Sequence, residues 1–341
     1  MPAETPFDDR GFHEPRRHHD PLAVRTVFVA PKRAERPMES DAPATGQPAR
    51  LAECPFCAGH ESLTPPAVLR MPPETDRPWH ARIIPNRYPV VEDFSAAPLQ
   101  HAPSHSHPAH GVHDVVIESP EHVRSILDVE PLRWRDVWEL CRQRLATLAG
   151  RTDLAWATVF KNSGPRAGAS LEHLHSQLVA LDFVPPAIAT ELAAAGRSAD
   201  AFADLVLSAE AEGRVVAERE DLVAFVPHAI RQPYETWILP RSAEAWFHAT
   251  SPARVAALAA LTQDIVARLD RIAPGADYNW WLHQAPFATH EDGQPTPIHW
   301  HWHLEILPRL TSFAGFELGT GCHISVATPA DSARQLRSAS A

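Results

Sequence analysis

The chain has 341 residues, 44% of them hydrophobic, which is enough apolar material for one large domain or two ordinary ones around a proper core. Its formal net charge of -11 at pH 7 leaves little basic surface for counterion release, which argues against a nucleic-acid partner. The first twenty residues are polar and proline-rich, and no later stretch is apolar over membrane-spanning length, so we expect a cytoplasmic protein without a membrane partner.

The predicted elements of the first half follow residues 1–24, which we expect to be a mobile N-terminal arm. Period-two alternation predicts strands, and a longer apolar periodicity predicts a helix. In chain order we expect a strand at 26–29, a loop at 38–53, strands at 81–84 and 113–118, a helix at about 131–148, a strand at 156–161, a glycine-rich loop at 162–169 and a strand at 173–180.

The second half repeats this order. Strands are expected at 222–225 and 236–239, a helix at 252–272, a strand at 278–283 and a histidine-rich strand at 299–307. Such a repeat indicates an internal duplication. We therefore predict an α+β fold with two halves, 25–190 and 191–330, each with a mostly antiparallel sheet and packed helices, followed by a tail at 331–341. We expect the two halves to share one core.

Three polar residues of one predicted strand, His173, His175 and Gln177, recur with period two. On a strand they point from the same face, while Leu174 and Ser176 point from the other. The glycine-rich loop before them has backbone amides that can approach a phosphate. This pattern indicates a site, and the alternative is a half-exposed strand with ordinary polar residues.

Cys54 and Cys57 lie in a Cys-Pro-Phe-Cys turn, a spacing better suited to a metal than to a disulfide. Tetrahedral zinc would need two further ligands, such as imidazoles.

Several segments, taken in order, resemble the galactose-1-phosphate uridylyltransferase family of the histidine-triad superfamily over roughly residues 25–325. The segment Arg33-Ala-Glu-Arg36-Pro37 resembles the family's Arg-Ala-x-Arg-Pro, which is followed there by a Cys-x-x-Cys. Ser119-Pro-Glu-His122 resembles its Ser-Pro-Asp-His. His173-Leu-His175-Ser-Gln177 resembles its His-Pro-His-x-Gln, with leucine in place of proline.

The resemblance implies a duplicated histidine-triad-like fold and roles for particular residues. Zinc would be held by Cys54, Cys57, His122 and His173, and His122 is preferred to His113 because it stands in the matching motif. His175 would be the nucleophile, assisted by Gln177. The substrate-binding residues would be Arg33, Arg36, Asn86, Asn162, Gly168, Ser170, Gln177 and Phe316.

A second metal site is also implied by the resemblance. Glu191 lies where the family has an acidic ligand, Trp281-Leu-His283 resembles its Trp-His, and His301-Trp-His303 resembles its His-x-His. One carboxylate and three imidazoles suit iron or zinc, in a structural role. The alternative is that these histidines line a half-buried strand.

The acceptor end departs from the family pattern. Gly315-Phe-Glu-Leu-Gly-Thr-Gly321 replaces the family's Lys-Phe-x-Val-Gly-Tyr-Glu. Together with Pro85-Asn-Arg-Tyr-Pro89, it looks more like a divergent branch that includes ADP-glucose phosphorylase and uses phosphate as acceptor.

The preferred hypothesis is a double-displacement nucleotidyltransferase of galactose metabolism, a UDP-glucose:hexose-1-phosphate uridylyltransferase. Neutral imidazole can attack phosphorus at pH 7, which supports a nucleotidyl-histidine. The alternatives are an ADP-glucose phosphorylase, a noncatalytic nucleotide- or zinc-binding module, and a nucleotide hydrolase. The expected partners are a nucleotide sugar and a sugar 1-phosphate or phosphate, and the family's dimers imply a homodimer.

Overall fold

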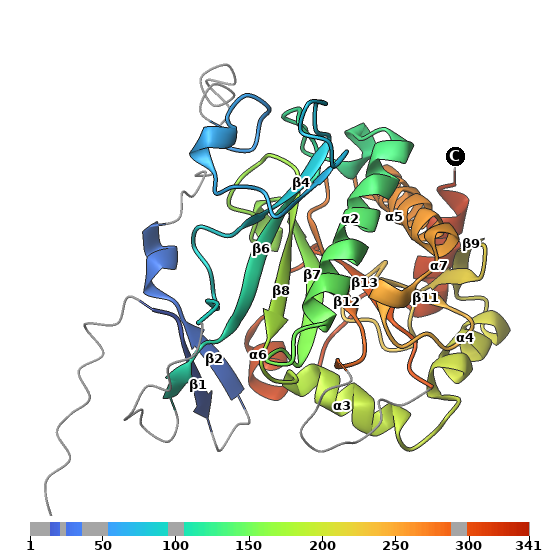
Figure 1. Ribbon diagram of the computed structural model, residues 1–341. Coiled ribbons are helices and arrows are strands. Elements are labelled where there is room, and N and C mark those ends of the chain that lie inside the picture. Colours follow the sequence, from blue (N-terminus) through green and yellow to red (C-terminus); the bar gives the residue numbers. More distant parts are fainter. Residues whose placement is uncertain (1–13, 21–24, 36–53, 95–105, 288–298, 341) are drawn as a thin grey trace, which may run out of the picture.

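The computed structural model describes residues 14–20, 25–35, 54–94, 106–287 and 299–340, which are built around a ten-stranded antiparallel sheet (Figure 1). Its strands, in sheet order, are β3 (Leu69–Met71), β4 (Ala81–Pro85), β6 (Gly111–Ile117), β8 (His175–Leu181), β7 (Trp156–Ser163), β12 (Tyr278–His283), β13 (His303–Pro308), β11 (Thr236–Pro240), β10 (Leu222–Phe225) and β9 (Val215–Arg219). A three-stranded sheet of β1 (Arg16–Asp20), β2 (Arg25–Val29) and β5 (Ser106–Pro108) lies beside it.

The strand order confirms the predicted duplication. From its outer edge, each half runs first, second, third, fifth, fourth strand, as β3-β4-β6-β8-β7 and as β9-β10-β11-β13-β12. Each half also has its long helix between the third and fourth strands, α2 (Pro131–Ala149) in one and α5 (Pro252–Ile272) in the other. The two half-sheets are joined by antiparallel pairing of β7 with β12. This pairing leaves neither half with an open edge in the middle of the molecule.

One face of the sheet packs against α2 and α5, which lie side by side (Figure 1). Proline at the first turn and an N-cap side chain, Glu130 for α2 and Ser251 for α5, start both helices. Trp134 of α2 and Trp280 of β12 are buried in the same core, which contains residues of both halves. The expectation of a shared core is therefore confirmed.

The other face is partly covered by α3 (Pro186–Ala195) and α4 (Ala201–Ala211). A second apolar cluster joins these helices to the sheet through Trp156, Val179, Ile188, Phe202 and Trp300. In the first half, β8 carries His175 and Gln177 on this face of the sheet.

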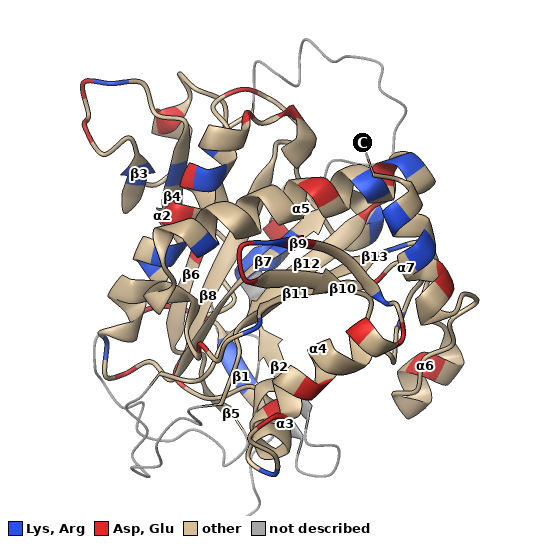
Figure 2. Cartoon of the chain, turned by 90° about the vertical axis from the view of Figure 1, so that its right-hand side faces the viewer, with Lys and Arg blue, Asp and Glu red and all other residues tan. Residues whose placement is uncertain are grey.

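The structure corrects the two predicted termini. Residues 16–20 of the predicted arm form β1, which pairs with β2 and β5. Most of the predicted tail belongs to α7 (Pro329–Ser338), whose Ala333 and Leu336 are buried. Figure 2 shows basic and acidic residues intermixed along α5 and α7, and Arg268 of α5 donates to the carbonyl of Leu336. Both segments are short: the apolar face of α7 is little more than Ala333 and Leu336, and β1 has its partners in the separate strands β2 and β5.

The remaining short elements connect the sheet. They are α6 (Gly315–Thr320) and the 3-10 turns Pro31–Glu35, Glu61–Leu63, Ile126–Asp128, Pro165–Ala167 and Phe247–Ala249. The predicted loop at 38–53 lies outside the described residues. None of the described helices has the length and apolarity needed to cross a membrane.

The contact between α2 and α5 yields a stability prediction. The buried Trp134 indole N–H donates to the Thr262 hydroxyl at 2.9 Å. Thr262→Val leaves that N–H without an acceptor, so the free energy of unfolding in urea should fall by about 1–3 kcal/mol. The control is Thr147→Val at an exposed position of α2, expected to change it by less than about 0.5 kcal/mol. Equal effects of the two substitutions would contradict the role of this hydrogen bond.

Candidate active site and metal clusters

The predicted ligands Cys54, Cys57, His122 and His173 lie together, with one ligand atom of each within 4.8 Å of the others. Cys54 Sγ is 3.4 Å from His173 Nδ1, and Cys57 Sγ is 3.6 Å from Nδ1 of both His122 and His173. The Cys-Pro-Phe-Cys turn supplies the sulfurs, with Cys57 N donating to Cys54 O. Two sulfurs and two imidazole nitrogens at this spacing fit tetrahedral zinc.

The protonation of this cluster also fits a cation. His173 Nε2–H donates to the carbonyl of Ser119 at 2.9 Å, so the Nδ1 lone pair faces the sulfurs. Burial lowers the pKa of His173 to about 4, which keeps the ring neutral. Burial, and then the neighbouring Cys54, raise the pKa of Cys57 to about 12. Without a cation Cys57 is therefore held as a thiol, and a bound metal ion would displace its proton.

Phe56 lies between the two cysteines in sequence and connects this cluster to the nucleophile candidate. Its ring packs edge-on against His173 at 5.9 Å and against His175 at 5.4 Å, centroid to centroid. Sequence reasoning did not identify Phe56. The sequence did hold a sign of its role: Phe56 is an aromatic residue inside the Cys-Pro-Phe-Cys turn. Once both cysteine sulfurs are directed toward the cluster, the direction of the Phe56 side chain is also determined.

His175 is the first residue of β8, which begins two residues later than predicted. Its Nδ1–H donates to the carbonyl of His173 at 2.7 Å, so the lone pair of the neutral ring is on Nε2. Strand alternation places the side chains of His175 and Gln177 on one face, and Leu174 and Leu178 belong to the core under α2 and α5. The imidazole is thus held in the tautomer that an Nε2 nucleophile needs.

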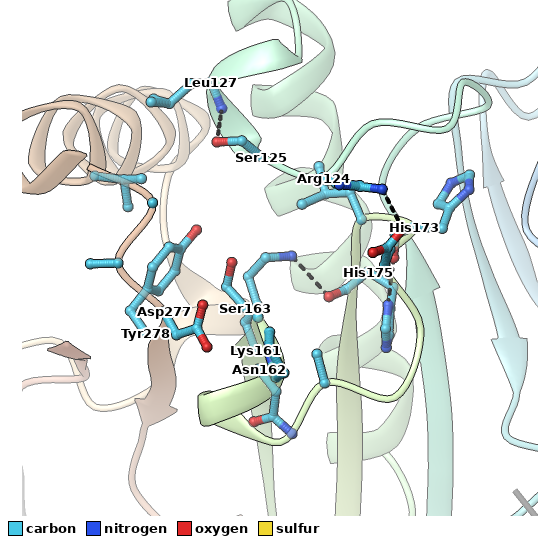
Figure 3. Close-up of a pocket in the computed structure, with 18 of the residues that line it drawn as sticks. Arg124, Ser125, Leu127, Lys161, Asn162, Ser163, His173, His175, Asp277 and Tyr278 are labelled. Carbon is cyan, nitrogen blue, oxygen red and sulfur yellow. Dashed lines mark hydrogen bonds and ion pairs between the residues drawn. The ribbon is translucent and has the colours of Figure 1, made fainter. Parts of the chain in front are cut away.

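A buried ion pair supports the backbone of His175 from the other face. Lys161 and Glu118 are each 1% exposed, and Lys161 Nζ donates to Glu118 Oε2 and, at 2.8 Å, to the carbonyl of His175. The Ser176 hydroxyl donates to the other Glu118 oxygen. Figure 3 shows Lys161 pointing toward the His175 backbone. Sequence reasoning missed this pair, because Lys161 lies in β7 and Glu118 directly follows β6, and these two strands are brought together only by β8 between them.

The glycine-rich loop is held by the second half of the chain. Gly164 has φ +85°, and a Cβ there would lie 1.9 Å from Asp277 Oδ1. Asp277 accepts the Arg166 backbone N–H at 2.6 Å. Asn279 Nδ2 donates to Asn162 Oδ1 at 2.8 Å and to the Ala167 carbonyl at 2.9 Å. The loop that was expected to bind phosphate is thus clamped by β12.

Gln177 and Asn86 meet at His113 of β6. Gln177 Oε1 is 2.9 Å from His113 Nε2, and Asn86 Nδ2 is 3.0 Å from the same nitrogen. Arg33 contacts the same loop as Asn86: its guanidinium donates to the carbonyl of Tyr88 at 2.9 Å. Arg36 lies outside the described residues.

Two recesses are lined by Asn162 of β7, and His175 lines the first of them. A cavity of about 510 Å³ is lined by residues 173–175 where β8 begins, by Asn162 and Ser170, and by Tyr278 (Figure 3). A more open groove of about 620 Å³ is lined by Phe160 and Asn162. Because Phe160 is paired with Gln177 across β7 and β8, this groove lies on the face of the His175 side chain. Phe316 lies on α6, 52% exposed, and lines neither recess.

The second predicted metal cluster forms with one change of ligand. Glu191, His283 and His303 come together with Glu305, and not with His301. His283 Nδ1 is 3.0 Å from Glu191 Oε1 and 3.4 Å from Glu305 Oε1, and His303 Nε2 is 3.6 Å from Glu191 Oε2.

His301 lies beside this cluster but is not one of its four residues. Its Nδ1–H donates to the carbonyl of Pro240 at 2.7 Å, and its ring stacks on Phe202. It stands just before β13, and the ring of Phe202 contacts both His301 and His303. Glu305 thus joins Glu191, His283 and His303 in the cluster, and the predicted role of His301 as a ligand stays a prediction.

The donor set of this second cluster fits a cation. Glu191 Oε2, His283 Nδ1 and His303 Nε2 are buried and make no hydrogen bond within the described residues. Burial raises the pKa of Glu305, but His303 and Arg231 outweigh this effect and bring the pKa down to about 2. Two carboxylates and two imidazoles suit iron or zinc.

Comparison with known proteins identifies relatives of the whole chain. Residues 7–185 match the family described as galactose-1-phosphate uridyl transferase, N-terminal domain, and residues 151–339 match a domain of unknown function, DUF4921. The ADP-glucose phosphorylase of Arabidopsis thaliana is 32% identical over 336 residues, covering 96% of this chain and 93% of that protein.

Two solved structures share the fold over nearly the full length. The crystal structure of an ADP-glucose phosphorylase from Arabidopsis thaliana with bound ADP-glucose has a TM-score of 0.73 at 30% identity, covering 95% of this chain and 99% of that chain. A uridylyltransferase structure has a TM-score of 0.77 at 26% identity, covering 95% and 98%.

We expect the purified protein to carry about one zinc in the Cys54, Cys57, His122 and His173 cluster, because its donor set closes a tetrahedron. Cys54→Ser and His122→Ala should each lose that zinc in metal analysis by mass spectrometry. Cys322→Ser, at an exposed cysteine outside the cluster, is the control and should retain it. Full zinc in folded Cys54→Ser and His122→Ala proteins would show that the cluster is not the binding site.

The ligand change in the second cluster is tested by a matched pair of histidines. His283→Ala should lower the content of a second metal and the unfolding temperature while leaving substantial turnover, as expected of a structural ion. His301→Ala should retain that metal if Glu305 is the fourth ligand, and should lose it if His301 is the ligand that the family resemblance implies. Loss of metal in His301→Ala but not in His283→Ala would contradict the assignment of Glu305.

Proposed function

The chain belongs to the galactose-1-phosphate uridylyltransferase family, and we propose that within it this protein is an ADP-glucose phosphorylase. It would move the AMP group of ADP-glucose to inorganic phosphate through His175. The observation that carries the proposal is the hydrogen bond from His175 Nδ1 to the His173 carbonyl, which places the Nε2 lone pair on the same sheet face as Gln177.

The reaction balances as two displacements. In the first, His175 Nε2 attacks the α-phosphorus, the N–P bond forms, and the anhydride bond to the β-phosphate breaks, so that glucose 1-phosphate leaves with the electron pair. In the second, a phosphate oxygen attacks the same phosphorus, the N–P bond breaks, and ADP leaves the neutral imidazole. Both steps need in-line positioning and charge stabilisation more than acid or base catalysis.

The residues around His175 supply these needs. The Gln177 amide donates to a phosphoryl oxygen, and the amides of the glycine-rich loop face the phosphates while Asn279 keeps Asn162 in place. The Lys161 ammonium donates to the His175 carbonyl and so holds the backbone of His175 in place during attack. Zinc held by Cys54, Cys57, His122 and His173 would brace the segment that leads into β8.

The choice of adenylyl group and phosphate acceptor rests on similarity. The relative with 32% identity is an ADP-glucose phosphorylase, and the segment Gly315–Gly321 departs from the hexose-binding pattern expected of a uridylyltransferase. The second candidate is UDP-glucose:hexose-1-phosphate uridylyltransferase. It is favoured by the family match over residues 7–185 and by the fold agreement at a TM-score of 0.77.

The proposed role of Phe316 depends on the formation of a dimer. It is 52% exposed on α6 and lines neither of the two recesses. Since the family forms dimers in which a neighbouring subunit completes the site, we propose that Phe316 serves the site of a second copy.

The proposal is tested by mixing the protein with ADP-glucose or with UDP-glucose in the absence of acceptor and recording intact-protein mass. We expect an AMP adduct that maps to the peptide containing His175 and is discharged by phosphate to give ADP. His175→Asn should form no adduct and should turn over at least about 10⁴-fold more slowly. Gln177→Ala should be slower by about 30-fold to 1000-fold, the equivalent of about 2–4 kcal/mol.

The alternatives give different results in the same experiment. A UMP adduct discharged by galactose 1-phosphate identifies the uridylyltransferase, and steady release of AMP into water identifies a hydrolase. Binding without any adduct identifies a noncatalytic module. An active protein whose adduct maps to a residue other than His175 would overturn the mechanism.

A further inference from the structure

We propose that His113 is a positioning residue for Gln177, holding its amide so that the NH₂ group, and not the oxygen, is presented to the transferring phosphoryl group. This inference rests on the proposed function, because it concerns the group that binds the phosphate. His113 is separate from both metal clusters.

The two side chains are neighbours on one sheet face. In the pairing of β6 with β8, His113 is opposite Val179 and Val115 is opposite Gln177, so His113 and Gln177 are diagonal neighbours. His113 is 5% exposed and Gln177 is 8% exposed. At this burial, water is a poor substitute for a lost partner.

The tautomer of His113 follows from its contacts. The backbone N–H of Val90 donates to His113 Nδ1 at 3.0 Å, and a backbone N–H can only donate. Nδ1 therefore carries the lone pair, and in the neutral ring Nε2 carries the hydrogen. The atom 2.9 Å from Nε2 is Gln177 Oε1, which accepts that hydrogen.

The direction of the Gln177 amide is set by this bond. Since its oxygen accepts from His113, its nitrogen occupies the other branch of the amide. A reversed amide would bring its N–H groups against the His113 N–H. Asn86 does not compete for the Nε2 hydrogen: its Oδ1 accepts the Tyr88 N–H at 2.8 Å, so its Nδ2, 3.0 Å from His113 Nε2, is itself a donor and cannot accept from that nitrogen.

His113 also joins Gln177 to the loop that follows β4. The Asn86 N–H donates to the His113 carbonyl at 2.8 Å, and Val90 donates to the ring. The loop with the predicted nucleotide-binding residue Asn86 and the predicted phosphate-binding residue Gln177 are therefore held by the same histidine.

A pair of substitutions separates the two ends of the His113 ring. His113→Asn keeps an acceptor near the Nδ1 position for Val90 but has no donor near Nε2. His113→Gln can place an amide N–H near the Nε2 position and so restore the bond to Gln177. We expect His113→Asn to slow AMP transfer to His175 in single turnover by about tenfold with little change in KM, and His113→Gln to recover most of the rate.

A double-substitution cycle distinguishes positioning from a general structural role. If His113 acts only through Gln177, His113→Asn should slow the transfer in the wild-type background and have no further effect in Gln177→Ala. An equal loss in both backgrounds overturns the proposal and leaves the nucleotidyl-histidine mechanism standing. Absence of any adduct in the wild-type protein overturns the proposed function and this inference together.

Gln177→Glu gives a second test that leaves His113 unchanged. The carboxylate can still accept from His113 Nε2–H, but it has no N–H to donate to the phosphoryl group. We expect its single-turnover rate to be no higher than that of Gln177→Ala. A rate equal to the wild-type rate would show that the amide nitrogen is not required and would overturn the proposal.

Discussion

The antiparallel pairing of β7 with β12 is the constraint on which the rest of the structure depends. It joins two half-sheets of the same strand order into one sheet and places the strands of both halves that bear the site side by side. Asn279 is opposite Asn162 in this pairing, so its amide reaches the glycine-rich loop, and Asp277 closes the loop at Gly164. The glycine-rich loop of one half, which we propose binds phosphate, is thus shaped by the other half, which gives a physical reason for both halves to remain in one chain.

Buried groups on both faces of β8 keep His175, the proposed nucleophile, in one arrangement. On one face, Lys161 and Glu118 compensate each other and hold the His175 carbonyl. On the other face, Phe56 packs against the His175 ring, and His113 bonds to Gln177. Each of these groups would be costly to bury alone, and each is satisfied only in the native arrangement. Such pre-organisation suits a transfer reaction in which little of the barrier comes from proton movement.

The two candidate metal clusters brace different junctions of the same fold. Cys54, Cys57, His122 and His173 tie the segment after β6 and the lead into β8 to the cysteine turn. The second cluster ties α3, through Glu191, to β12 and β13. The first cluster therefore lies close to His175, the proposed nucleophile, and the second lies under α3 and α4, the helices that cover one face of the sheet.

The sequence by itself determined the elements with long-range periodicity and the residues whose motif places them. The helix expected at 252–272 is α5 with the same bounds, because its apolar positions, Ser251 cap and Pro252 are all local features. The period-two facing of His175 and Gln177 is likewise a local property of any strand. Only the tertiary structure decided partners that come from separate elements: Glu305 with Glu191 and His283, Lys161 with Glu118, and His113 with Gln177. The physical reason is that strand pairing sets which side chains approach across the sheet, and the register of β6, β7, β12 and β13 is a collective result of packing that no single segment encodes.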